Sequence, residues 1–430
     1  MGRQNRATNI MDRILIHLPA YREPELIPTI ESALQNAEYP DRLVFGICRQ
    51  YNPDDGFDNL DKYENNPQFK VYHLHYEKAK GLAYARAIIN EELLDDEEFV
   101  LQLDSHHRFD TNFDTRLINW YNQLKEEGNN PLICGYLPYY DPFNDPKSRI
   151  KEPWFSEPAS FYPHGTIFIR PTAFKDDWTK FTKPVPARFM SGHFCFGPNK
   201  WAKEIKHDTD IYFAGEELNL TIRSYTHGYD LFHPHEVIIW HATMREERAG
   251  MLAWDDNNKK GNDKWIEQTN QARAKIRQLL GVEDNGFDLT GYDIGKVRTV
   301  RDYEKYAGIH FAKKSLQRYT QERSLPPNPV IENHEDWENS FMYSFYYLVD
   351  IHSHMLPNKD YDFILIAFDD ENGDPIETET IEGSRLEQYL YEGTPIHYEK
   401  MFSTDVAPKR VVYWAHSADR GWAERHEILL

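Results

Sequence analysis

The stretch Phe99-Val-Leu-Gln-Leu-Asp-Ser-His-His-Arg-Phe109 decides the fold class of this chain. Four of the five residues before Asp104 are apolar, as expected of a strand covered on both faces of a sheet. Asp104 and His106 follow at the C-terminal end of this strand, where open α/β sheets bind their ligands. A carboxylate and an imidazole suit a divalent cation such as Mn²⁺ or Mg²⁺, bound together with phosphate oxygens. Because Asp-x-His is also typical of surface turns, its surroundings in the chain have to support this interpretation.

The segments around this stretch predict a parallel α/β sheet of nucleotide-binding type. Strands and helices are expected in the order strand, helix, strand, strand, helix, strand over about 90 residues, which is the pattern of a parallel sheet with crossover helices. No Gly-x-Gly-x-x-Gly or phosphate-loop motif is present, so the sequence supports neither a dinucleotide enzyme nor a phosphate-loop ATPase. The predicted segments are Ile14–Leu18, residues 25–37, Leu43–Cys48, Val71–His75, a helix carrying residues 83–89, and Phe99–Leu103.

The rest of the chain divides at a proline cluster. Further strands are predicted at residues 132–138, 166–170 and 237–240, and helices at residues 216–225 and 267–280, with an irregular covering segment over residues 139–164. Pro326-Pro-Asn-Pro329 is the best linker, and the alternating apolar pattern after it predicts a β-rich module. The predicted domains are a leader at 1–10, a catalytic domain at 11–325 and an accessory domain at 326–430.

Composition narrows the class of protein and of partner. The formal net charge of −21 argues against nucleic acid and anionic membranes as partners. Three cysteines without paired spacing indicate reduced thiols, and no apolar run is long enough to span a membrane, so a cytoplasmic protein is predicted. The first 10 residues lack the apolar core of a signal peptide and are expected to be disordered. No oligomeric state is predicted.

Several short motifs, taken in order, resemble glycosyltransferases of the GT-A fold. The closest resemblance is to the hydroxyproline-directed polypeptide N-acetylglucosaminyltransferases, and a more distant one is to the polypeptide N-acetylgalactosaminyltransferases. Together they cover about residues 11–312. The motifs are Pro19-Ala-Tyr-Arg22, Lys80-Gly-Leu-Ala-Tyr-Ala-Arg86, Leu103-Asp-Ser-His106, Ser191-Gly-His-Phe-Cys-Phe196, Gly215-Glu-Glu-Leu-Asn-Leu-Thr-Ile-Arg223, Trp240-His241 and residues 295–308.

The resemblance implies a GT-A-like mixed sheet of the nucleotide-diphospho-sugar transferases, flanked by helices, with a smaller β-rich domain after it. It also implies that Asp104, His106 and His241 ligate one Mn²⁺ or Mg²⁺ ion that binds the phosphates of a UDP-sugar, with UDP-N-acetylglucosamine as the expected donor. A core histidine at a strand end is the alternative for His241. For His107 and His193 a structural hydrogen-bonding role is predicted. The donor-binding residues that the resemblance implies are Pro19, Ala20, Tyr21, Arg22, Arg49, Gln50, Gly81, Asp104 and Ser105.

Three residues are expected to take part in the reaction. Arg86 is placed where a guanidinium could hold a phosphate or a carboxylate in bidentate fashion, although an ordinary surface ion pair is the alternative. Glu216 and Glu217 open a helix after Gly215, where a negative charge also stabilises the helix N-terminus. By resemblance, one of the two carboxylates contacts the transferred sugar or the acceptor hydroxyl, and Glu216 is favoured. Transfer with retention is implied, whereas an inverting enzyme would need a base on the opposite face.

The predicted function is a metal-dependent transfer of N-acetylglucosamine from a UDP-sugar to a hydroxyl of a polypeptide hydroxyproline or a glycan. A metal-dependent nucleotide-sugar hydrolase or nucleotidyltransferase is one alternative, although such enzymes usually bind two metals with more carboxylates. A non-catalytic carbohydrate-binding or scaffold protein is the other alternative. The intact set of Asp104, His106, Glu216 and His241 argues against a decayed site.

Overall fold

The computed structural model describes residues 12–162, 164–243, 250–253, 255–256, 264–351, 356, 358, 360–391 and 396–430. The predicted leader at residues 1–10 lies outside these ranges. Contacts between residues divide the chain into two compact units. Unit 1 consists of Met1–Glu157, Arg170–Ala307 and Arg323–Asn328, and unit 2 of Pro158–Ile169, Gly308–Glu322 and Pro329–Leu430. The domain boundary at residues 325/326 stays a prediction.

Unit 1 is built on a mixed sheet of eight strands in the order β3-β2-β1-β4-β10-β6-β11-β9. The first four strands in this order are parallel, as the sequence predicts, and β10 then runs antiparallel to both β4 and β6. Every residue of β4 is buried, which explains its nearly continuous apolar sequence. The strands are β1 (Ile14–Tyr21), β2 (Leu43–Tyr51), β3 (Phe69–His75), β4 (Phe99–Leu103), β6 (Pro131–Cys134), β9 (Val185–Pro186), β10 (Phe194–Pro198) and β11 (Asp230–His233).

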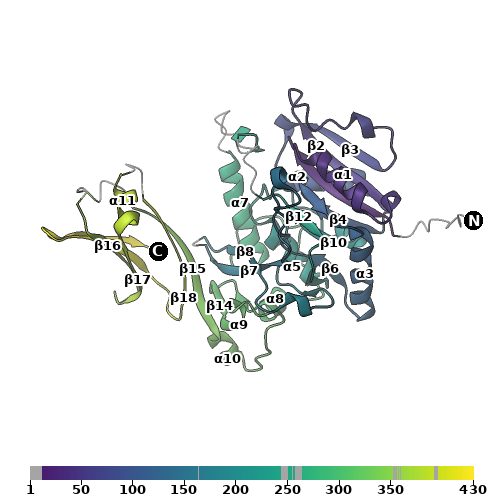
Figure 1. Ribbon diagram of the computed structural model, residues 1–430. Helices are drawn as coiled ribbons and strands as arrows, with labels where there is room; N and C mark the ends of the chain where they lie inside the picture. The colour runs from purple at the N-terminus through teal and green to yellow at the C-terminus, as the bar shows by residue number, and fades with distance from the viewer. Residues whose placement is uncertain are drawn as a thin grey trace, which may run out of the picture. The chain divides into compact units, whose positions relative to one another are not determined.

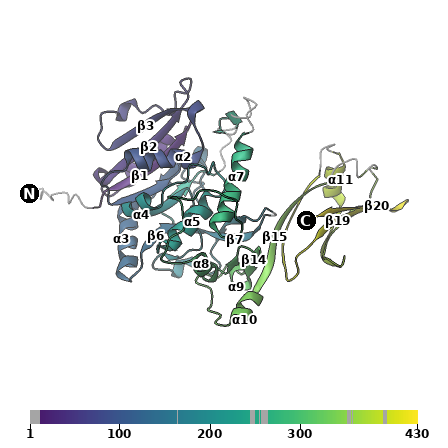
Figure 2. The ribbon, with the colours of Figure 1, turned by 180° about the vertical axis from the view of Figure 1, so that it is seen from behind.

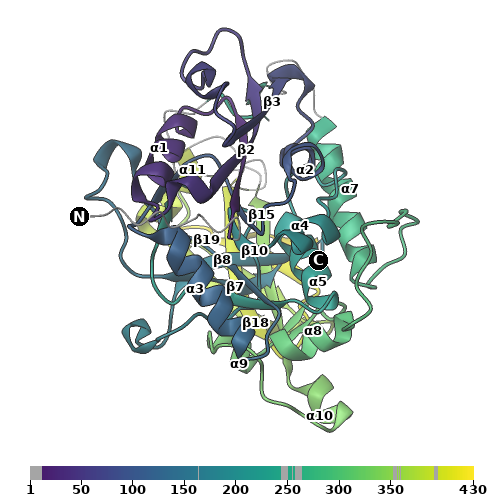
Figure 3. The same ribbon diagram turned by 90° about the vertical axis from the view of Figure 1, so that its right-hand side faces the viewer.

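Helices cover both faces of this sheet, as Figure 3 shows. On one face α1 (Leu26–Asn36) and α3 (Phe113–Glu126) contribute to a core that contains Ile16 and Leu101. On the other face a second core forms around Leu15 and Val100. Because alternate residues of β1 and β4 enter opposite cores, both strands are fixed in register. The helices of the second face are α2 (Leu82–Ile88), α4 (Asn199–Glu204) and α5 (Glu216–Thr226), and α5 also contacts α7 (Lys264–Leu279) and α8 (Val300–Ala307) (Figure 2).

A small two-stranded sheet continues from the end of β4. It pairs β5 (His107–Phe109) with β12 (Ile239–His241) in antiparallel fashion. In this register His241 lies opposite His107, which is the residue directly after His106 in the sequence. The pairing therefore brings the end of β12 beside the Asp104–His106 turn.

Unit 2 is rich in strands (Figure 1). Its longest pairing joins β15 (Phe341–Ile351) and β18 (Ile396–Thr404), and a four-stranded sheet has the order β17-β16-β19-β20. Residues of both sheets and of α11 (Gly383–Tyr391) form one hydrophobic core. The four strands are β16 (Phe363–Asp369), β17 (Pro375–Glu382), β19 (Arg410–Ser417) and β20 (Gly421–Leu429).

The predicted fold class, a mixed α/β sheet flanked by helices and followed by a β-rich part, is confirmed. The interpretation of residues 139–164 as irregular throughout is wrong, because β7 (Trp154–Phe161) lies within them. With β8 (Ile167–Ala173), it joins a sheet that also holds β13 (Ile309–His310), β14 (Ser315–Gln317) and β15. All three cysteines are buried free thiols. Among the described helices, none is both long enough and apolar enough to cross a bilayer.

Candidate metal and donor site

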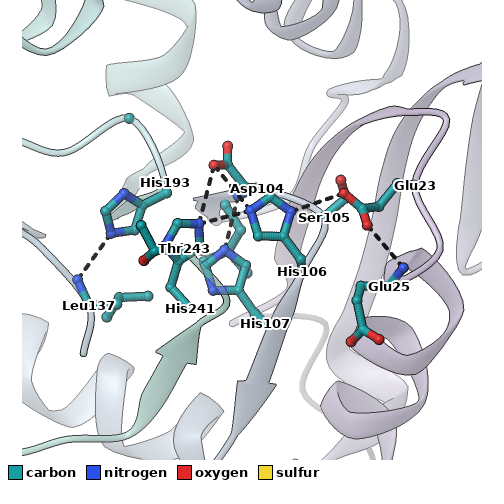
Figure 4. A network of polar contacts seen from close by, with 12 residues as sticks. Glu23, Glu25, Asp104, Ser105, His106, His107, Leu137, His193, His241 and Thr243 are labelled. Atoms are coloured by element: carbon teal, nitrogen blue, oxygen red, sulfur yellow. Dashed lines mark hydrogen bonds and ion pairs between the residues drawn. The ribbon is translucent and has the colours of Figure 1, made fainter. Parts of the chain in front are cut away.

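Asp104, His106 and His241 place three potential ligand atoms around one point (Figure 4). The Nε2 atoms of His106 and His241 are 2.9 Å apart, and Oδ2 of Asp104 lies 3.8 Å and 3.5 Å from them, respectively. Ligands bound at about 2.1 Å lie about 3.0 Å apart when their bonds to the ion are perpendicular. The three donor atoms are thus close enough to bind the same cation.

Contacts behind the two histidines support this role. Nδ1 of His106 lies 3.1 Å from Oε2 of Glu23, and since an ionised carboxylate only accepts, the hydrogen belongs on Nδ1. The lone pair of Nε2 then faces the shared point. Nδ1 of His241 lies 3.2 Å from the hydroxyl of Thr243. A hydrogen-bonded outer shell of this kind is typical of histidines that ligate metals, so the residues present fit a divalent cation.

Arg86 connects the triad to the carboxylates of α5. Its side chain is fully buried and donates to Oδ1 of Asp104 at 2.8 Å, and its Nε lies 3.0 Å from Oε1 of Glu216. A third contact is a hydrogen bond to the carbonyl of Leu103 at 3.0 Å. This is a buried network rather than the surface ion pair that the sequence left as an alternative. Oδ1 of Asp104 is held by Arg86 and leaves Oδ2 to face the histidines.

The ionisation of Asp104 follows from these contacts. Burial opposes the charged form, but the hydrogen bond with His241 and the positive charge of Arg86 outweigh burial and hold the pKa of Asp104 well below its usual range. The carboxylate is therefore ionised at neutral pH and available as a ligand.

Glu216 and Glu217 stand at the N-terminus of α5, after a glycine that the fold requires. Gly215 has a φ of 96°, and a Cβ there would lie 2.0 Å from Cδ1 of Ile276. Burial raises the pKa of Glu216, while Arg86 partly offsets the shift. Burial and the negative charge of Glu216 raise the pKa of Glu217 to about 7. The pair combines a carboxylate fixed by arginine with one that binds a proton near neutral pH.

These groups line one cavity of about 420 Å³ in unit 1. All three members of the triad, Arg86, Glu216 and Glu217 contribute to its wall. Of the predicted donor-binding residues, the cavity wall also includes Pro19, Tyr21, Gln50, Gly81 and Ser105. The carboxyl ends of β1, β2 and β4 thus meet at one site, as expected of parallel strands.

Three predicted donor-binding residues are not among the residues that line this cavity. Ala20 is fully buried in β1. Arg22 forms ion pairs with Asp55 at 2.7 Å and Asp256 at 2.9 Å, and Arg49 pairs with Asp58 at 2.7 Å. Both guanidinium groups are thus engaged with carboxylates of the chain itself.

Other lining residues were not predicted from the sequence. Glu23, which contacts His106, lies in the turn directly after Tyr21-Arg22, so its place beside a predicted motif was the available signal. Tyr212 is almost fully buried in the wall, whereas Phe213 is 53% exposed at the cavity. No motif pointed to these two aromatic residues, which precede the Gly215-Glu216 motif by only a few positions. Tyr136, His193, Thr243, Leu252 and Ala253 also line the cavity.

A family model described as Glycosyltransferase (GlcNAc) matches residues 56–313, which include most of these groups. No curated protein matches the chain. Solved structures with similar folds include GalNAc-T7 with UDP, GalNAc and Mn²⁺ (15% identity, TM-score 0.42), which aligns over 54% of this chain and 44% of that one. The chain thus spans less than half the length of that relative.

Two structures of S. aureus TarS are also similar. Residues 1–349 in complex with UDP align at 14% identity and a TM-score of 0.36, over 65% of this chain and 73% of that chain. The longer TarS structure aligns at 12% identity and a TM-score of 0.36, over 97% and 77% of the two chains.

Proposed function

The chain belongs to the Glycosyltransferase (GlcNAc) family, and from this premise we propose that it transfers N-acetylglucosamine from a UDP-sugar to a hydroxyl group with the help of a divalent cation. The observation that carries the proposal is that three side chains that could ligate one cation share a cavity with a buried arginine and two carboxylates. The description of the family supports N-acetylglucosamine as the sugar. The narrower hydroxyproline-directed family stays a proposal.

Asp104, His106 and His241 would hold Mn²⁺ or Mg²⁺. A cation bound there would offset the negative charge that develops on the departing diphosphate. Arg86 keeps the carboxylate of Asp104 ionised and oriented, so that the site needs little rearrangement when the donor binds. The donor-site residues Tyr21 and Gln50 lie at the ends of two neighbouring strands, where an aromatic ring and an amide can stack on and hydrogen-bond to a uracil base.

Glu216 and Glu217 would face the transferred sugar and the acceptor. With retention of configuration, a phosphate oxygen of the leaving group takes the acceptor proton, and no strong base is needed. Glu216, held by Arg86, would then orient a hydroxyl of the sugar. The raised pKa of Glu217, about 7, suits a group that shares a proton with the acceptor hydroxyl.

The acceptor is proposed as a hydroxyl of a polypeptide hydroxyproline or of a glycan. The net charge of −21 makes nucleic acid an unfavourable partner. A cytoplasmic location stays a prediction.

Release of UDP from a panel of UDP-sugars, with Mn²⁺ and again with EDTA, tests the proposal. We expect turnover of UDP-N-acetylglucosamine that EDTA abolishes and Mn²⁺ restores, and its loss in Asp104→Asn. Asp110→Asn is a matched control, because Asp110 pairs with Arg116 and does not line the cavity. Release of UMP would favour the hydrolase or nucleotidyltransferase instead. Absence of turnover together with absence of metal-linked nucleotide binding would favour a non-catalytic binding protein.

A further inference from the structure

Two further histidines border the triad but supply no ligand atom. His107 lies beside the triad (Figure 4) and is completely buried, and both of its ring nitrogens contact the backbone. Its Nε2 lies 3.2 Å from the N–H of Asp104, and its Nδ1 lies 3.0 Å from the carbonyl of Trp240. A backbone N–H only donates and a carbonyl only accepts, so Nε2 carries the lone pair and Nδ1 the hydrogen. The imidazole is thus neutral, and neither nitrogen is available to a metal.

These two bonds connect the segments that carry the ligands. One partner is the backbone N–H of Asp104 itself, and the other is the residue directly before His241. The side chain of His107 therefore connects the end of β4 with the end of β12 through two hydrogen bonds. Strand pairing alone gives the register of β12 against β5, but it does not fix the backbone of Asp104.

His193 fixes the ring of His241 from one side. The two imidazoles stack with centroids 4.2 Å apart and planes at 7°, while His107 packs near the same ring at 4.9 Å and 30°. Nε2 of His193 accepts from the N–H of Leu137 at 3.0 Å, so its Nδ1 carries the hydrogen and lies 2.7 Å from the hydroxyl of Ser191. His193 is thus a second neutral imidazole with both nitrogens engaged.

We propose that His107 and His193 are positioning residues, which hold the backbone of Asp104 and the ring of His241 in the geometry that receives the divalent cation. The inference rests on the proposed function, because it assumes that the triad binds a cation. Two neutral rings suit this task, since they orient the ligands without placing a positive charge beside the cation. This role also explains why four histidines meet here although only His106 and His241 direct a ring nitrogen at the shared point.

The test measures metal binding directly, by titrating the full chain with Mn²⁺ and following the electron paramagnetic resonance signal of the free ion. His107→Phe keeps an aromatic ring but loses both backbone bonds, and we expect it to bind Mn²⁺ about 10–100-fold more weakly than the wild type. His107→Asn, which can still donate to Trp240, is expected to lose less. His193→Ala is expected to lose more affinity than His193→Phe, which retains the stacking.

A second readout reports the geometry of the site. With Co²⁺ in place of Mn²⁺, the visible absorption spectrum of His107→Phe and His193→Ala is expected to differ from that of the wild type, because the ligands are no longer held in the same positions. His235→Phe is the control for loss of a buried histidine, since His235 packs on Trp120 and does not line the cavity. Unfolding midpoints of all variants separate a loss of fold from a loss of binding. If His107→Phe does not fold, His107→Asn takes its place.

The outcomes distinguish the metal site of the proposed function from the positioning role of His107 and His193. If the wild type binds no Mn²⁺, or Asp104→Asn binds it equally well, the metal site of the proposed function fails and the inference fails with it. If the wild type binds and Asp104→Asn does not, while the His107 and His193 variants bind like the wild type with an unchanged Co²⁺ spectrum, only the inference is overturned. Weaker binding with an altered spectrum supports it.

Discussion

Replacing Arg86 by methionine would remove the only group that places a positive charge between Asp104 and Glu216 in the described site. The side chain is fully buried and forms contacts of 2.8 Å and 3.0 Å with the two carboxylates. Breaking a buried ion pair by removing one partner typically costs about 3–5 kcal/mol, because an uncompensated charge stays behind. We therefore expect Arg86→Met to lower the free energy of unfolding at pH 7.5 by about 3–5 kcal/mol.

The loss of unfolding free energy in Arg86→Met should be larger at higher pH. Without Arg86, the pKa values of Asp104 and Glu216 in the folded state rise relative to those of the wild type, because Arg86 lowers both. A group with a raised folded pKa loses stability as the pH rises through that value. Each pKa unit corresponds to about 1.4 kcal/mol, so the deficit of Arg86→Met relative to the wild type should be about 1–3 kcal/mol larger at pH 7.5 than at pH 5.5.

Urea unfolding in EDTA, at both pH values, measures this deficit as the shift of the midpoint multiplied by the slope of the transition. Arg86→Lys is the matched control, because it keeps the charge but cannot reach both carboxylates with a planar fork, and it should lose less. A deficit below about 1 kcal/mol, or one that is equal at the two pH values, would contradict the argument that Arg86 compensates two buried charges.

Three other predictions address the cavity. Asp104→Asn should reduce Mn²⁺-dependent UDP release by at least about 100-fold, because it removes one charged ligand, and it should destabilise the fold less than Arg86→Met does, because Arg86 keeps Glu216 as an ion-pair partner; retained release would contradict the ligand assignment. The pKa of Glu217 is raised to about 7, so its ionisation costs stability as the pH rises through this value. At pH 8.5 the free energy of unfolding, measured with urea, should therefore be about 1–3 kcal/mol higher for Glu217→Gln than for the wild type, whereas at pH 5 the two values should be equal. Gly81→Ala should raise the KM for the donor and destabilise the fold more than Gly128→Ala, since both glycines have positive φ but only a Cβ at residue 81 would lie 2.5 Å from the carbonyl of Tyr212.

The elements that could be predicted from the sequence are those whose own residues determine the secondary structure. The apolar run Phe99–Leu103 is a strand with the same bounds in the structure, because complete burial of β4 selects for apolar residues along the strand. The predicted helix at 25–37 is observed at Leu26–Asn36. The antiparallel strand β10 between β4 and β6 was not predicted, since its partner lies far away in the sequence and pairing of distant segments leaves no periodic signal.

In the candidate site, too, some residues could be predicted from the local sequence, whereas others depend on contacts between distant segments. Asp104 and His106 follow directly from the end of a predicted strand, and the motifs around them, with their resemblance to a known family, indicate a role as cation ligands. The chemical environment of Arg86 could not, because it depends on Asp104 and on Glu216 at the start of a later helix. The contact of Glu23 with His106 likewise joins the ends of two strands that are adjacent only in the folded sheet.

Glu23 and Thr243, which were not predicted from the sequence, each contact a histidine of the triad, and their physical role explains why they were missed. A ligand has to present a particular atom, which restricts the residue type, whereas a positioning group needs only a donor or acceptor of the right reach. The backbone bonds of His107 and His193 satisfy buried polar groups and hold the cation ligands at the same time. In a site that buries several carboxylates around one arginine, such bonds offset part of the cost of desolvation, so the stability of this region and the geometry of its cation site should vary together.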